Sequence, residues 1–388
     1  MRRIRVLQIT PGIAIGDQSG GAELYALQIN RLLSKEEFDP AVFVMTRFGS
    51  PSEDAWRSKL IAERITIGGF IRPNSSITKY LSNVFRNLWE FTTKFRPEVI
   101  NSHTERGDLL NNLIHLFHPI HPKSVRTVHI DQTWVTHPFA GAILNQACFP
   151  LTINLETAVS ETIVKQLDNR GIARLINKDA ILIHNGIDES YFSSPPRTSA
   201  NPPLPDGISE VQPRIGIIGR LTDQKGHADL LVAFKTVNEN FRTHLLIIGS
   251  GPLESNLKQL SHELGIHDHV YFLGNRNDVM DILPHLDFVV SASLWEGFPT
   301  VLLEAMSQEI PVIATDISGS CELIQSGRTG ILVSPSNPHN LAEAIMQLLS
   351  DPNKALEMGK RAREYASQFT IQNASRGHAK LYKSLIAD

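Results

Sequence analysis

The feature that most limits how this chain can fold is a regular alternation of short β-branched runs with longer helix-like stretches. It begins with the apolar run Arg5–Thr10, passes through a glycine-rich loop, and reaches a stretch with helical spacing over Ala22–Leu33. Strands separated by helices favour a parallel sheet with helices on both faces, because a helical crossover returns the chain to the start of the next parallel strand. The first part of the chain therefore predicts an α/β domain.

The alternation restarts after a proline-rich segment, residues 193–213, whose polar composition predicts a linker. Further strands are predicted at Pro40–Met45, Glu98–Ser102, Ser124–His129, Ala180–His184, Arg214–Gly219, Leu245–Gly249, His269–Gly274, Phe288–Ser291, Val312–Thr315 and Gly330–Val333, and further helices at Ile77–Phe95, Glu161–Asn169, Asn340–Leu349 and Lys354–Gln368. We therefore predict an α/β protein of two Rossmann-like doubly wound parallel-sheet domains, 1–192 and 214–370, facing each other across a cleft. A C-terminal helix, 371–388, is expected to pack back on the first domain.

Composition excludes several classes of protein. The 37 Lys and Arg residues are balanced by 40 Asp and Glu residues, so the net charge of −3 provides no general attraction for nucleic acid. No apolar run is long enough for a transmembrane helix, and Gln8 interrupts the N-terminal run before it could act as a signal peptide. Cys148 and Cys321 are too few for a disulfide framework. We expect a cytoplasmic protein, and the basic amphipathic stretch Ile77–Phe95 leaves open a peripheral contact with the inner membrane face.

The segment Ser293–Met306 carries the strongest chemical signal. It follows a buried strand, and Gly297 supplies a bend before Pro299, which is well suited to be the first helical residue. The backbone amides that would then lack intrahelical partners are those of Phe298, Thr300 and Val301. Because free amides and the helix dipole attract anions, this turn predicts a phosphate site.

Two carboxylates flank this predicted phosphate site. Glu304 lies one turn into the helix, where it could reach the hydroxyls of a ribose, and Glu296 precedes the bend at the other end of the ligand. Acids on both sides of a phosphate site favour a nucleotide sugar, in which hydroxyl-rich groups flank a diphosphate. The alternative is that both glutamates are ordinary solvated residues.

Two cations follow the strand Arg214–Gly219. Arg220 and Lys225 flank a short turn at the carboxyl end of that strand, so both could neutralise a diphosphate in the same cleft. The chain contains no Asp-x-Asp pair, and the local run of His115, His118 and His121 has no carboxylate or thiolate partner. We therefore predict diphosphate binding without a metal or cofactor, against the alternative of a helix-capping turn with surface cations.

The first domain offers weaker signals. Adjacent glycines at Gly20 and Gly21 open a helix and would let the backbone approach a ligand. His103 and His129 stand at the ends of two predicted strands and could point into the cleft, although a hydrogen-bonded core histidine is an equally good interpretation of each.

Taken together, the motifs resemble the retaining family 4, or group 1, of GT-B glycosyltransferases. In the second domain the resemblance is carried by Gly219-Arg220, Leu245–Pro252, Phe272–Gly274, Glu296–Glu304, Pro311–Thr315 and Thr329–Val333, and in the first by Gly20–Glu23, Thr127–His129, Ala158–Ser160 and Asn185–Asp188. The resemblance implies transfer of a sugar from a UDP- or GDP-sugar to the hydroxyl of a carbohydrate, lipid-linked or other acceptor. Polysaccharide, glycolipid or other glycoconjugate biosynthesis is the expected setting.

The resemblance also implies a role for each matched residue. Arg220 and Lys225 would hold the diphosphate, the segment from Phe298 through Pro299 and Thr300 to Val301 would contact it through the backbone, and Glu304 would hold the ribose. Glu296 would contact the donor sugar, Gly21 would touch the donor phosphates, and His103 and His129 would face the substrates, with His129 beside the reacting centre. His129 and Glu296 are the candidate catalytic residues.

Two departures from the family pattern leave the donor sugar open. They are Glu309–Val312, where relatives often have a glycine before the proline, and Gly319–Glu322, where they often have paired glycines. Acceptor contacts are expected from the loops 73–77 and 133–140, where the resemblance is weakest. The competing functions are a nucleotide-sugar epimerase of GT-B type and a non-catalytic nucleotide-sugar-binding protein.

Overall fold

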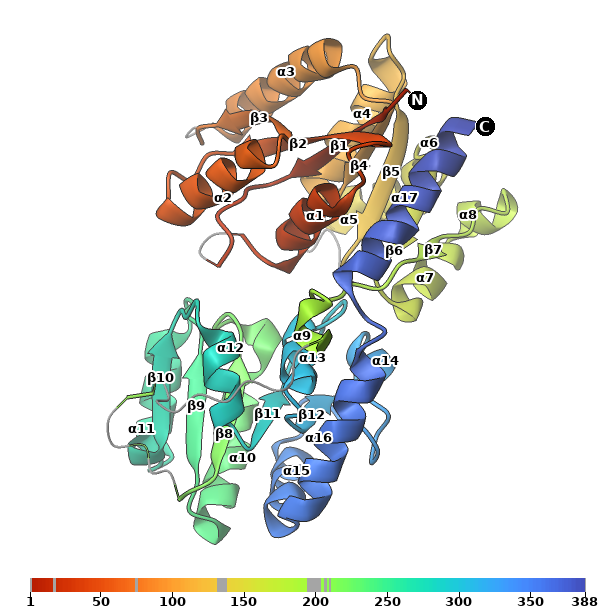
Figure 1. Cartoon of the computed structure of the whole chain (residues 1–388). Helices are drawn as coiled ribbons and strands as arrows, with labels where there is room; N and C mark the ends of the chain where they lie inside the picture. The colour runs from red at the N-terminus through yellow and green to blue at the C-terminus, as the bar shows by residue number, and fades with distance from the viewer. Residues whose placement is uncertain are drawn as a thin grey trace. The chain divides into compact units, whose positions relative to one another are not determined.

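A computed structural model describes residues 2–16, 19–73, 76–130, 138–193, 204–205, 208 and 211–387 (Figure 1). The chain divides into two compact units. Unit 1 comprises Met1–Asn185 and Ile371–Asp388, and unit 2 comprises Gly186–Thr370. Residues 186–193, which we assigned to the first domain and the start of the linker, are thus grouped with unit 2. Most of the expected linker and parts of the expected acceptor loops lie outside the described residues.

Unit 1 is built on a parallel sheet with the strand order β3-β2-β1-β4-β5-β6-β7. The strands are β1 Ile4–Thr10, β2 Phe38–Thr46, β3 Thr66–Ile71, β4 Val99–Ser102, β5 Lys123–Val128, β6 Leu155–Ala158 and β7 Ile181–Leu182. The helices are α1 Gly21–Leu32, α2 Pro51–Ala62, α3 Ile77–Phe95, α4 Glu105–Phe117, α5 Pro138–Ile143, α6 Phe149–Thr152, α7 Glu161–Asp168, α8 Gly171–Leu175 and α17 Ile371–Ala387, with a π-helical turn at Leu144–Cys148.

Successive residues of β1 pack on opposite faces of the sheet, and helices cover both faces. Val6 belongs to a core cluster with Tyr25 and Ile29 of α1 and Leu381 of α17. The next residue, Leu7, points to the opposite face, into a cluster formed with α3 and α4. Because both faces are buried, the strand carries apolar residues on both sides, as expected for a parallel sheet.

Unit 2 repeats this architecture with the strand order β10-β9-β8-β11-β12-β13, again parallel. The strands are β8 Arg214–Ile218, β9 His244–Ile248, β10 Val270–Gly274, β11 Phe288–Ser291, β12 Val312–Thr315 and β13 Ile331–Val333. The helices are α9 Ser190–Ser193, α10 His227–Asn240, α11 Glu254–Glu263, α12 Val279–Ile282, α13 Thr300–Ser307, α14 Ser320–Leu323, α15 Pro338–Ser350 and α16 Pro352–Ala366. The prediction of two Rossmann-like parallel-sheet domains is therefore confirmed.

Helix α17 brings the last part of the chain back to unit 1, where it packs against α1 (Figure 1). Ile371, Ala374 and Leu381 are buried in the cluster that contains Tyr25 and Ile29. One side of the unit 1 sheet is thus covered by residues from both ends of the sequence.

Two strands of unit 1 were not predicted. β3 contains Gly68 and Gly69, which lower strand propensity, and it lies at the edge of the sheet. β6 carries Glu156 and Thr157 in a buried strand, so its sequence lacks the apolar character on which the prediction relied. Among the described residues, no helix is long and apolar enough to cross a membrane.

Candidate functional site

In unit 2 the loops that follow β8 and β11 are joined by hydrogen bonds. The two strands are neighbours in the sheet, so their carboxyl ends bring these loops together. The amide of Leu294 donates to the carbonyl of Gln224 at 2.7 Å, and the Gln224 side chain donates to the carbonyl of Trp295 at 3.0 Å. The segments that carry Lys225 and Glu296, predicted separately from sequence, therefore form one surface.

Lys225 and Glu296 contact each other directly. The Lys225 ammonium forms an ion pair with Oε1 of Glu296, and the Ser293 hydroxyl donates to the same oxygen at 2.9 Å. The carbonyl of Ser293 in turn accepts from the Thr315 hydroxyl at 2.5 Å. Glu296 is 8% exposed, so a nearly buried carboxylate is balanced by one cation and one hydroxyl.

A glycine is required where the chain passes from Lys225 into α10. Gly226 has a φ of 63°, and a Cβ there would lie 2.0 Å from the carbonyl oxygen of Ala292. Only glycine allows the loop after β8 to approach the end of β11 so closely.

Helix α13 begins one residue later than predicted. Pro299 is its N-cap, with an extended ψ of 96°, and the first helical residue is Thr300. The expectation that Pro299 is the first helical residue is therefore wrong. Proline fits the cap because its φ of −78° is allowed there while its carbonyl accepts from the amide of Leu302 at 3.1 Å. Within the described residues, the amides of Thr300 and Val301 donate no hydrogen bond, so two donors remain at this end of the helix.

The loop before α13 is held in place by packing. The Phe298 ring contacts that of Phe369 edge to face, with centroids 5.4 Å apart. Gly319, with a φ of 78°, lies so near that a Cβ would be 2.2 Å from the carbonyl oxygen of Gly297. These contacts fix the turn from which the free amides project.

Glu304 lies on α13, and burial raises its pKa to about 7. In the described part of the chain its carboxylate forms no hydrogen bond or ion pair. A carboxylate that is desolvated but unpaired is costly in the free protein and well suited to accept hydrogen bonds from a ligand. Arg220 is exposed, and its guanidinium likewise has no partner among the described residues.

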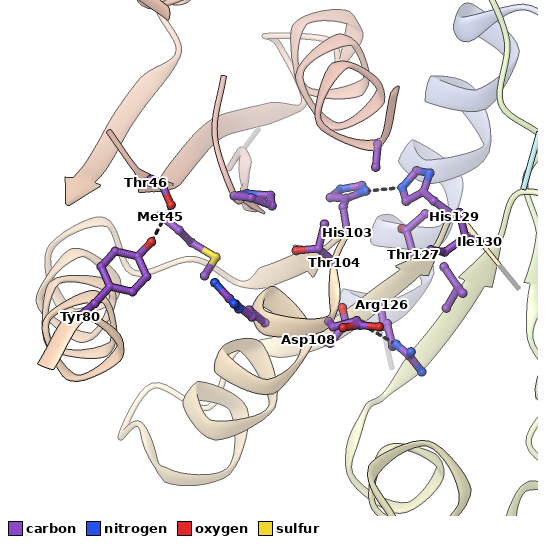
Figure 2. A pocket seen from close by; sticks show the side chains of 15 residues that line it. Met45, Thr46, Tyr80, His103, Thr104, Asp108, Arg126, Thr127, His129 and Ile130 are labelled. Atoms are coloured by element: carbon purple, nitrogen blue, oxygen red, sulfur yellow. Dashed lines mark hydrogen bonds and ion pairs between the residues drawn. The ribbon is translucent and has the colours of Figure 1, made fainter. Parts of the chain in front are cut away.

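Unit 1 contains a cavity of about 480 Å³ at the carboxyl ends of β1, β2, β4 and β5 (Figure 2). It is lined by Pro11, Ala22, Met45, Thr46, Tyr80, His103, Thr104, Glu105, Arg106, Asp108, Arg126, Thr127, Val128, His129 and Ile130. Tyr80 and Thr46, whose hydroxyls are 2.5 Å apart, form one side, and His103 and His129 form the other. This position is where open α/β sheets usually bind ligands.

His103 and His129 are directly joined. Nδ1 of His103 lies 3.0 Å from Nε2 of His129 (Figure 2). Nε2 of His103 lies 2.7 Å from Oε1 of Gln8. Burial lowers the pKa of His129 to about 3, and burial together with His129 and His378 lowers that of His103 well below its ordinary value. Both rings are therefore neutral near pH 7. Both His103 nitrogens already have protein partners, so neither is left to bind a substrate.

Helix α17 supplies two polar side chains to this region that the sequence did not indicate. The Tyr382 hydroxyl accepts from Gln8 at 3.2 Å and from Asn101 at 2.9 Å, and Nε2 of His378 lies 3.0 Å from the Tyr25 hydroxyl. The available signal was a histidine and a tyrosine four residues apart on the apolar face of a predicted helix. Their partners lie more than 250 residues earlier in the chain, so spacing could not identify them.

Arg126 was also missed. It is 1% exposed and forms ion pairs with Asp108 at 2.7 Å and Glu156 at 3.0 Å, while Glu156 is also paired with Arg170. Burial raises the pKa of Asp108 despite the attraction of Arg126, whereas Arg126 and Arg170 together outweigh burial and hold the pKa of Glu156 below its ordinary value. Arg126 lines the cavity as part of a neutralised network.

Gly21 is the first residue of α1, and a Cβ there would contact nothing within 4 Å. Glu23 caps the helix, since its carboxylate accepts from the amide of Gly20 at 3.0 Å. The described residues contain no group of three or more His, Cys, Asp or Glu side chains arranged to hold a metal ion.

Comparison with known proteins adds a family to this geometry. Residues 205–365 match the family "Glycosyl transferases group 1", and residues 19–191 match "Glycosyltransferase Family 4". The N-acetyl-alpha-D-glucosaminyl L-malate synthase of Bacillus anthracis is 32% identical over 213 residues, which are 55% of this chain and 55% of that protein. The match thus spans about half the length of this relative.

Two solved structures share the fold over nearly the whole chain. Anabaena HepE in complex with UDP and glucose gives a TM-score of 0.77 at 20% identity, covering 98% of this chain and 100% of that one. Sucrose-phosphate synthase of Thermosynechococcus elongatus gives 0.79 at 19% identity, covering 99% and 100%.

Proposed function

The chain belongs to the group 1 glycosyltransferases, and on this premise we propose that it transfers a sugar from a UDP- or GDP-sugar to an acceptor hydroxyl with retention of anomeric configuration. The proposal includes no metal and no cofactor. One observation carries the proposal. Lys225 and Glu296 form an ion pair, and the loop that carries Glu296 continues into α13, whose first amides are free.

We assign the donor to unit 2. Lys225 and Arg220 attract the diphosphate, and the amides of Thr300 and Val301 donate to its oxygens at the positive end of the helix. Glu304 accepts hydrogen bonds from the ribose hydroxyls, and Glu296 accepts from hydroxyls of the donor sugar. These contacts supply the charge stabilisation for which other transferases use a divalent ion.

We assign the acceptor to the unit 1 cavity, which is large enough for one sugar-sized group. The bond between the anomeric carbon and the phosphate oxygen breaks, its electron pair stays on the nucleoside diphosphate, and the acceptor oxygen bonds to the same face of that carbon. The acceptor proton goes to the departing phosphate oxygen. His129 contacts the substrates beside the reacting carbon, and Glu296 has no nucleophilic role.

The choice of acceptor is open within this proposal. The Bacillus anthracis relative is named as a synthase of N-acetyl-alpha-D-glucosaminyl L-malate, so a small hydroxylated acid belongs in the first acceptor screen beside sugars and lipid-linked sugars.

The proposal is tested first by binding. Nucleoside diphosphates and their sugars are screened by thermal shift, and the best ligand is titrated by calorimetry into wild type, Lys225→Met and Lys258→Met. Lys258 is the matched control because it forms an exposed ion pair with Glu254 elsewhere in unit 2. We expect Lys225→Met to weaken nucleotide binding about tenfold or more and the control to leave it unchanged.

Transfer is then measured with acceptors present and absent, in EDTA. Release of UDP or GDP that depends on an acceptor, with a product of retained configuration by NMR, supports the proposal. An epimerised nucleotide sugar without acceptor would instead identify an epimerase, and tight nucleotide binding without turnover across the screen would identify a binding protein.

A further inference from the structure

We propose that His103 is a positioning residue that fixes the ring nitrogen His129 presents to substrate, through a hydrogen-bond chain that ends at Tyr382 of the C-terminal helix. This inference rests on the proposed function, in which His129 lies beside the reacting carbon. It adds a specific state for His129: a proton on Nε2, and a bare Nδ1 that accepts a hydrogen bond from a substrate hydroxyl.

Which group donates in each of these hydrogen bonds is set at the end of the series that lies farthest from His129. The Asn101 carbonyl accepts from the Thr127 hydroxyl at 3.0 Å, which leaves the Asn101 amide to donate to Tyr382. The Gln8 amide nitrogen also donates to the Tyr382 hydroxyl, so both lone pairs of that oxygen are used.

With its nitrogen on Tyr382, Gln8 turns its carbonyl oxygen toward Nε2 of His103. That ring nitrogen must therefore carry the proton, and the neutral ring accepts at Nδ1. The Nε2–H group of His129 then donates to His103. Among the described residues, Nδ1 of His129 has no protein partner, and His129 lines the cavity.

The side chains of this hydrogen-bond series come from neighbouring strands of the sheet. Gln8 and Asn101 are direct neighbours on β1 and β4, and Thr127 and Thr157 are neighbours on β5 and β6. The Thr157 hydroxyl donates to that of Thr127 at 2.9 Å, which continues the same polar row under α17. These four side chains are at most 1% exposed, so solvent cannot substitute for a lost partner.

A second contact holds the ring of His129: it comes from Tyr25 of α1, which is itself joined to α17. The Tyr25 ring meets that of His129 edge to face, with centroids 5.1 Å apart, and the Tyr25 hydroxyl contacts His378. His129 is thus fixed by a hydrogen bond on Nε2 and by an aromatic ring. Both supports lead to the same helix.

The first test observes the tautomer directly and requires no enzymatic activity. Side-chain nitrogen NMR of ¹⁵N-histidine protein, with His129 assigned by its loss in His129→Gln, should show one neutral form with the proton on Nε2. Tyr382→Phe removes the oxygen that orients Gln8 and should populate the second tautomer. A single Nδ1–H form in wild type, or an unchanged spectrum in Tyr382→Phe, would overturn the inference.

The control is Tyr365→Phe, which removes one hydroxyl hydrogen bond to a carbonyl in unit 2. It should leave the His129 signals unchanged. This comparison separates the effect of the chain from a general effect of losing a tyrosine hydroxyl.

The second test is kinetic. His103→Ala should lower kcat about a hundredfold, the loss expected when a group beside the reacting carbon is misplaced, while the donor KM stays within about threefold. His103→Gln keeps a donor and an acceptor and should recover part of the loss. Tyr382→Phe should lower kcat by a smaller factor, and Tyr365→Phe should not lower it.

The outcomes distinguish this inference from the proposed function. If no sugar is transferred but the tautomer behaves as expected, the proposed function fails and the hydrogen-bond chain stands. If transfer is found and both His103→Ala and Tyr382→Phe retain kcat, His103 is only a structural residue and the inference fails.

Discussion

Replacing Glu304 with glutamine is expected to stabilise the ligand-free protein at alkaline pH while weakening nucleotide binding. Burial raises the pKa of Glu304 to about 7, and the described residues supply its carboxylate with no ion pair. A glutamine of nearly the same shape removes the desolvated charge. The same change removes the strongest acceptor that we assign to the ribose.

The magnitude follows from linkage. A pKa raised from 4.5 to about 7 means that the folded state prefers the protonated acid. The stability from this preference is complete below pH 4.5 and is lost as the pH rises through 7. At about 1.4 kcal/mol per pKa unit, Glu304 lowers the free energy of unfolding, relative to a neutral side chain at the same position, by about 1 kcal/mol at pH 5 and about 3 kcal/mol at pH 8. The gain from Glu304→Gln should therefore grow with pH.

The assay is urea unfolding of the full chain at pH 5 and pH 8, followed by circular dichroism, with Glu364→Gln as the matched control. Glu364 is exposed on α16, so its replacement should change the free energy of unfolding by less than about 0.5 kcal/mol at either pH. Nucleotide affinity is measured on the same samples by calorimetry and should fall about tenfold in Glu304→Gln.

Two results would refute the reasoning. If Glu304→Gln is no more stable than wild type at pH 8, the carboxylate is solvated or paired and its pKa is not raised. If its stability behaves as expected but nucleotide affinity is unchanged, burial is correct and the assignment of Glu304 to the ribose is wrong.

Three further changes are predicted. Glu156→Gln leaves Arg126 and Arg170 buried with one acid fewer and should lower the free energy of unfolding by about 3–5 kcal/mol in urea titrations; a loss below about 1 kcal/mol would show that the network is not buried. Burial, reinforced by His129, lowers the pKa of His378 from 6.5 to about 3, so the folded state resists protonation and the free energy of unfolding falls as the pH drops below 6.5. His378→Gln should remove about 2 kcal/mol of the decrease in the free energy of unfolding between pH 7.5 and 5. An unaltered pH profile of stability would contradict this. Gly319→Ala places a Cβ against the carbonyl of Gly297 and should displace the turn before α13, weakening nucleotide binding in calorimetry while Gly327→Ala, which meets open space, preserves it.

The sequence predicted the sheet of unit 2 more completely than that of unit 1. Strands such as β9 and β11 are short apolar runs bounded by turn residues, which is the pattern that sequence analysis detects best. β6 was not predicted, because its buried Glu156 is polar and is neutralised by arginines from elsewhere in the fold. A strand stabilised by ion pairs cannot be identified from hydrophobicity alone.

The candidate site could likewise be predicted only in part from the sequence. Lys225 and Glu296 follow strands that are neighbours in the sheet, so their proximity could be predicted from motif position, although their direct ion pair could not. His103 and His129 were likewise placed at strand ends. Their hydrogen bond, and its continuation to Tyr382, depend on strand register and on a helix from the opposite end of the chain.

The return of α17 to unit 1 also affects how the protein is made. A ribosome completes the seven strands of the first sheet well before it reaches Ile371, so the side of the sheet around Tyr25 and Ile29 waits uncovered while the whole of unit 2 is synthesised. A fragment that stops at Asn185 would keep this apolar surface exposed and should aggregate. A permuted gene that places residues 371–387 ahead of Ile4 would let the nascent sheet bury that surface as it emerges.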